Sequence, residues 1–156
     1  MALDSTARES NVRDSFKKFF IDNLYTSEHV KLTFDKGLAV PKLQGDISVE
    51  SWIAVLFGPM YMGNVSEMTL QIYCCTRKDK EGYQLAHLRD KVLGYLTDIS
   101  QDDGVRRIPL YKSNETPWSQ VGSMRVVVDM ESGQMTAEDE TKFKIISIRL
   151  KWGSKI

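Results

Sequence analysis

The sequence has few of the residues that most often carry catalysis or bind metals. Its two histidines, His29 and His87, are far apart and each is expected to be solvated. Its two cysteines, Cys74 and Cys75, are adjacent, which is neither the CxxC spacing of a zinc site or redox pair nor a disulfide framework. Glycine-rich phosphate loops and GxSxG motifs are absent. The sequence therefore predicts that the protein is not an enzyme and binds no cofactor or metal.

Long apolar segments and an excess of one charge are also missing. No apolar run approaches the roughly 18 residues of a membrane span, and the opening MALDSTARES lacks a hydrophobic signal region. We therefore expect synthesis in a reducing cytoplasm and no membrane contact. Basic and acidic residues balance at 21 each, so nothing attracts the whole chain to nucleic acid. The 156 residues fit one domain, 1–156.

Two segments have the apolar spacing of amphipathic helices. The first spans about 7–25 and begins with a capping box, in which Thr6 precedes Glu9 by three residues. Its apolar stripe consists of Val12, Phe16, Phe19, Phe20 and Leu24. The second spans about 83–98, with a stripe of Leu85, Leu88, Val92, Leu96 and Ile99. Each helix is expected to cover a core with one face.

The first half of the chain also contains the alternation that is typical of β-strands. Residues 30–34 and 38–40 are expected to form a hairpin around Gly37. Residues 51–57 are apolar at successive positions, which favours a central strand covered on both faces. That strand is expected to pair antiparallel with 67–76 across a loop from residue 58 to residue 66.

Three more strands are expected in the second half, at about 105–111, 122–131 and 140–152. Pro109 favours a sheet edge for the first of them. The alternation of the last one slips, which predicts a β-bulge near Ile145 and Ile146. The order of helix, strands, helix and strands predicts an α+β domain, with an antiparallel or mixed sheet packed against two main helices.

Two predicted loops carry large apolar side chains. The stretch FGPMYMG, residues 57–63, and the stretch KSNETPWSQV, residues 112–121, both contain a proline. The candidate contact residues in them are Met60, Tyr61, Met62 and Trp118. Because aromatic residues and methionine are enriched in protein contacts, these side chains either bind another protein or fold back over the core. The sequence leaves both interpretations open.

Charges separate near the C-terminus. After the acidic residues Glu138, Asp139 and Glu140, every charged residue is basic. Arg149 and Lys151 are the contact candidates among these basic residues. The simplest interpretation is a solvated strand beside a polar loop. The alternative is a dipolar surface that meets its complement on a neighbouring copy, and heterologous contacts of this kind close into rings.

The middle of the chain carries a longer pattern. WIAVLF is followed by GNVSEMTLQIYCCT, then the polar turn RKDKEG, then a helix with the spacing LxxLxDxVxxxL from Leu85 to Leu96. This run resembles the tail terminator, or tail completion, proteins of long-tailed bacteriophages. Length and element order match that family over nearly the whole chain.

The resemblance implies a structural virion protein of the tail or neck. Such a protein is expected to form a homohexameric ring that caps the tail tube, stops its polymerisation and joins it to the head-completion or connector protein. DNA would only pass through the lumen, which suits a balanced charge. The alternatives are another head–tail connector or tail-tube component, or a small cytosolic protein-binding domain.

Overall fold

The computed structural model describes residues 9–35, 50–61, 63, 65–113, 116–137 and 141–153. The helical elements in these ranges are α1 (Glu9–Phe20), η1 (Ile21–Thr26), η2 (Lys80–Gly82) and α2 (Tyr83–Leu96). The strands are β1 (Lys31–Phe34), β2 (Ser51–Tyr61), β3 (Val65–Thr76), β4 (Arg107–Lys112), β5 (Ser119–Glu131), β6 (Met135–Thr136) and β7 (Lys142–Gly153). The predicted α+β class and both predicted helices are confirmed, although the sheet dominates. The place of Ile99 in the second apolar stripe is wrong, because α2 ends at Leu96 and Ile99 is exposed.

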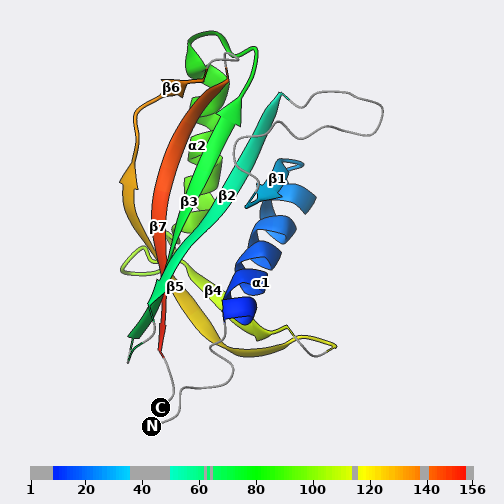
Figure 1. Ribbon diagram of the computed structural model, residues 1–156, viewed down its shortest axis with the longest axis vertical. Helices are drawn as coiled ribbons and strands as arrows, with labels where there is room; N and C mark the ends of the chain where they lie inside the picture. Colours follow the sequence, from blue (N-terminus) through cyan, green and yellow to red (C-terminus); the bar gives the residue numbers. More distant parts are fainter. Residues whose placement is uncertain are drawn as a thin grey trace.

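The strands form one mixed sheet in the order β1-β2-β3-β7-β5-β4, with β6 paired to β7. β1 runs parallel to β2, and the other pairs are antiparallel. The twisted sheet curves around α1 and α2, which share one core on its inner face (Figure 1). Four successive residues of β2, from Trp52 to Val55, are buried, so the prediction of a strand covered on both faces is confirmed.

β2 is longer than expected, and the predicted loop from Gly58 to Ser66 is wrong. β2 continues to Tyr61 and β3 begins at Val65, so the chain turns within a few residues. The contact candidate Met62 lies outside the described residues, as do the predicted return strand 38–40 and the cap at position 6.

Gly58 and Pro59 interrupt the strand pairing without ending the strand. The register between β2 and β3 shifts between Phe57 and Met60, so the two residues occupy a β-bulge. Proline is tolerated there because a bulged residue need not donate to the ladder. Glycine is needed because a Cβ at position 58 would lie 2.9 Å from the backbone oxygen of Thr69.

The predicted bulge at Ile145 and Ile146 is also wrong. β7 pairs with β3 over its full length without a register shift. The irregularity lies instead in β5, between Val128 and Met130. Ile145 simply alternates onto the face that points away from the helices, while Ile146 enters the core.

α1 covers the outer edge of β4, where Pro109 lies as predicted at the edge of the sheet. The backbone N–H of Tyr111 donates to Ser15 Oγ at 2.8 Å, and that of Ser113 donates to Asn11 Oδ1 at 3.1 Å. Pro109 has no N–H to offer. Asn11 and Ser15 are both buried. An exposed strand edge is a template for pairing with other chains, and here helix side chains and a proline close it.

Candidate interaction surfaces

An open groove of about 690 Å³ lies between the N-terminal helical segment and the connection from β4 to β5. It is called the α1 groove here. Its helical wall consists of Asp14, Lys17, Lys18, Ile21 and Asp22, and its other wall of Tyr111, Thr116, Pro117 and Trp118. The loop predicted at 112–121 is shorter in the structure, because β4 ends at Lys112 and β5 already begins at Ser119.

Trp118 is part of the lining of the α1 groove. Its side chain is 38% exposed, and its ring centroid lies 6.3 Å from that of Tyr111. On the opposite wall Lys18 and Asp22 form an ion pair of 2.6 Å, and this hydrogen bond raises the pKa of Lys18. The groove therefore combines exposed aromatic surface with a charged wall that is partly neutralised within the chain.

A second exposed apolar surface lies at the turn between β2 and β3. Tyr61 is 65% exposed and Val65 is 59% exposed. Ser66 Oγ accepts from Gly63 N and donates to Gly63 O, both at 3.3 Å, which holds the turn. A Cβ on Gly63 would lie 3.0 Å from the Tyr61 ring, so glycine leaves room for that ring. Tyr61, Gly63 and Val65 are called the hairpin tip.

The structure separates the two interpretations of the FGPMYMG stretch residue by residue. Met60 is partly buried and packs against the core, while its neighbour Tyr61 points into solvent. Successive strand residues face opposite sides, so one side chain covers the core and the next is free for contact. Trp118 lines the α1 groove. It comes just before β5, and the start of β5 and the end of β2 lie on opposite sides of the lower end of the molecule (Figure 1).

The basic contact candidates of β7 already have acidic partners within the chain. Arg149 binds both carboxylate oxygens of Asp129 on β5, at 2.8 and 3.0 Å from Nε, and contacts Glu67 of β3 at 3.4 Å. The Asp129 hydrogen bonds raise the pKa of Arg149. Lys151 lies 3.9 Å from Glu67. Contact of these two residues with a neighbouring copy stays a prediction.

The acidic partners that the sequence proposed for them, Glu138, Asp139 and Glu140, lie outside the described residues. The separation of acids and bases seen along the sequence is therefore not the arrangement found on the sheet. There, acidic residues of β3 and β5 flank the basic residues of β7 on both sides.

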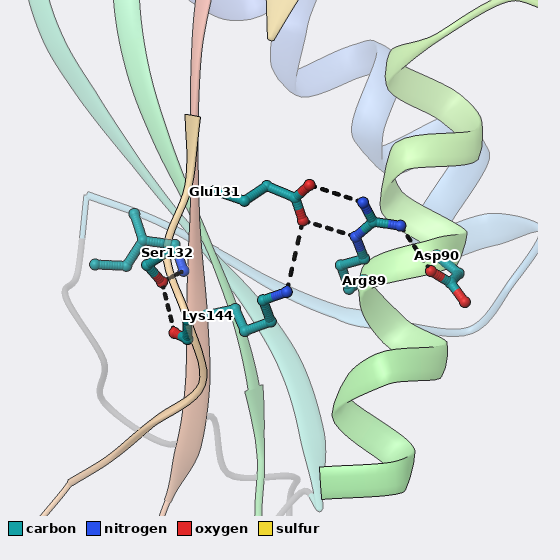
Figure 2. Close-up of polar contacts among 7 residues, drawn as sticks. Arg89, Asp90, Glu131, Ser132 and Lys144 are labelled. Carbon is teal, nitrogen blue, oxygen red and sulfur yellow. Dashed lines mark hydrogen bonds and ion pairs between the residues drawn. The ribbon is translucent and has the colours of Figure 1, made fainter. Parts of the chain in front are cut away.

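A polar network that the sequence did not reveal ties α2 to the sheet. Figure 2 shows Arg89 of α2 paired with both oxygens of Glu131 on β5, at 2.6 and 2.7 Å. Lys144 of β7 approaches the same carboxylate at 3.7 Å, and Asp90 contacts Arg89 at 2.9 Å. The Arg89 hydrogen bonds lower the pKa of Glu131. Bidentate pairs of this kind orient the two elements they join.

Glu131→Gln is expected to lower the free energy of unfolding by about 1.5 kcal/mol at neutral pH. The physical reason is that the amide cannot accept from both Arg89 nitrogens, and Glu131 is half-buried. Because the folded pKa of Glu131 is lowered, the loss should shrink as pH falls below its ordinary value of 4.5. Urea denaturation at several pH values measures this. Asp90→Asn is the matched control, because Asp90 is exposed, and equal losses for both variants would contradict the assignment.

Few features of the described residues indicate catalysis or metal binding. Cys74 and Cys75 are both buried, and burial raises the pKa of the Cys74 thiol to about 12. Within the described ranges no three histidine, cysteine or acidic side chains are grouped to hold a metal ion. In the same part of the chain no helix has the length and apolarity to cross a membrane. The His87 ring packs edge-on against Tyr83, with the centroids 4.4 Å apart.

Comparison with known proteins identifies the fold and nothing finer. No protein family matches the sequence, and no curated protein matches it. Several solved structures match, and one of them does so with a TM-score of 0.60 over 96% of this chain and 97% of its own. Its sequence is 7% identical, and its designation names no function. The likeness therefore shows that the chain has the same α+β fold over nearly its whole length.

Proposed function

We propose that this chain is a structural virion protein, a ring-forming phage tail terminator. Two exposed apolar surfaces support the proposal, the hairpin tip and the α1 groove. The strand ends beside them, the end of β2 and the start of β5, lie on opposite sides of the lower end of the molecule in Figure 1. A chain with two different adhesive surfaces associates head to tail, and such contacts close into a ring when the rotation between copies permits.

In this proposal the ring is a homohexamer that caps the tail tube and stops its polymerisation. Its other partners are the tail-tube protein on one side and the head-completion or connector protein on the other. DNA passes through the lumen, and the balanced charge of the chain suits a channel that does not hold it. The protein is made in the host cytoplasm and ends in the tail or neck of the virion. Another neck or tail component would use the same two surfaces.

A small protein-binding domain is the second candidate. The α1 groove favours it, because about 690 Å³ with an exposed tryptophan is enough to hold several side chains of an extended peptide. In that case the groove would bind a foreign segment and the protein would remain a monomer.

Mixing the purified protein with tail tubes, polymerised from the tail-tube protein of the same phage genome, tests the proposal. We expect electron microscopy to show added density at one end of each tube, and turbidity to show that elongation stops. Native mass spectrometry of the capped ends should give a multiple of the subunit mass. Bare tube ends and unchanged elongation would refute the terminator function. A persistent monomer that captures peptides from a random peptide library would instead support the binding domain.

A further inference from the structure

We draw no further inference here: the strongest candidate, the α1 groove between the N-terminal helical segment and the connection from β4 to β5, has a charged lining of two lysines and two aspartates that balance, and nothing in the described part of the structure shows what covers it.

Discussion

Asp79→Ala is expected to lower the free energy of unfolding by about 2–3 kcal/mol. The Asp79 side chain is only 6% exposed and accepts three hydrogen bonds. Two come from backbone N–H groups in the first turn of α2, Gln84 at 3.1 Å and Leu85 at 2.9 Å, and one from the Thr76 hydroxyl at 3.1 Å. Removing the carboxylate leaves three donors without a partner and takes a negative charge from the positive end of the helix dipole.

The Asp79 effect should depend on pH. Burial alone would raise the pKa of Asp79, but the hydrogen bonds from Gln84, Leu85 and Thr76 outweigh it, and the pKa lies below its ordinary value of 3.8. The stabilisation is therefore complete above that value and is lost as pH falls through the folded pKa. Urea denaturation between about pH 7 and pH 3 should show wild type and Asp79→Ala converging.

Asp102→Ala provides the control for Asp79, because Asp102 is an exposed acid in a turn and should change stability by less than about 0.5 kcal/mol. If the difference in the free energy of unfolding between wild type and Asp79→Ala stays constant down to pH 3, the helix cap does not depend on the charged carboxylate and the prediction is wrong.

The double variant Asn11→Ala with Ser15→Ala is expected to lose about 2–4 kcal/mol of stability and to aggregate. Together the substitutions leave two backbone N–H groups, those of Tyr111 in β4 and of Ser113 just after it, without their helix partners. The same change opens the edge of the sheet to other chains. This protein is proposed to assemble through two defined surfaces. An open strand edge would compete with them, because strand pairing between chains can continue without closing.

Hydrogen exchange measures this effect locally. The amides of Tyr111 and Ser113 should exchange faster in the double variant, while light scattering should rise with concentration. Ser10→Ala changes an exposed residue of the same helix and should alter neither signal. Unchanged exchange at Tyr111 and Ser113 would show that α1 does not close the edge of β4.

The periodic features of this chain could be predicted because they depend on neighbours three or four residues away, or on alternate residues. The stripe from Val12 to Leu24 gave the first helix, and the one from Leu85 to Leu96 gave the second. Successive apolar residues in 51–57 gave a strand covered on both sides. Pro109 marked an edge, since it cannot donate to a ladder.

The bulges were missed because they depend on the partner strand. Taken alone, Gly58 and Pro59 predict the end of a strand. In the structure β2 continues to pair with β3 beyond them, as far as Tyr61. The slip in the alternation of β7 was assigned to a bulge in that strand, while the irregularity belongs to its neighbour β5. A register shift is a property of two strands, so one strand cannot show where it lies.

The polar contacts were missed because they join residues far apart in the chain. Arg89 and Glu131 are 42 positions apart, and Ser15 and Tyr111 are 96 positions apart. Asp79 looked like one more charge in a polar turn, because it caps α2 from before η2 and not from the residue next to the helix.

The sequence by itself predicted both helices and the approximate position of most strands, but not β6 or the continuation of β2 past Gly58, and it marked Tyr61 and Trp118 as unusual for their surroundings. Tertiary structure alone decided that Met60 turns to the core while Tyr61 faces solvent, that Arg149 is paired within its own sheet, and that the tip and the groove lie on opposite sides. Local propensity acts over a few residues, whereas a surface is assembled from segments that only folding brings together.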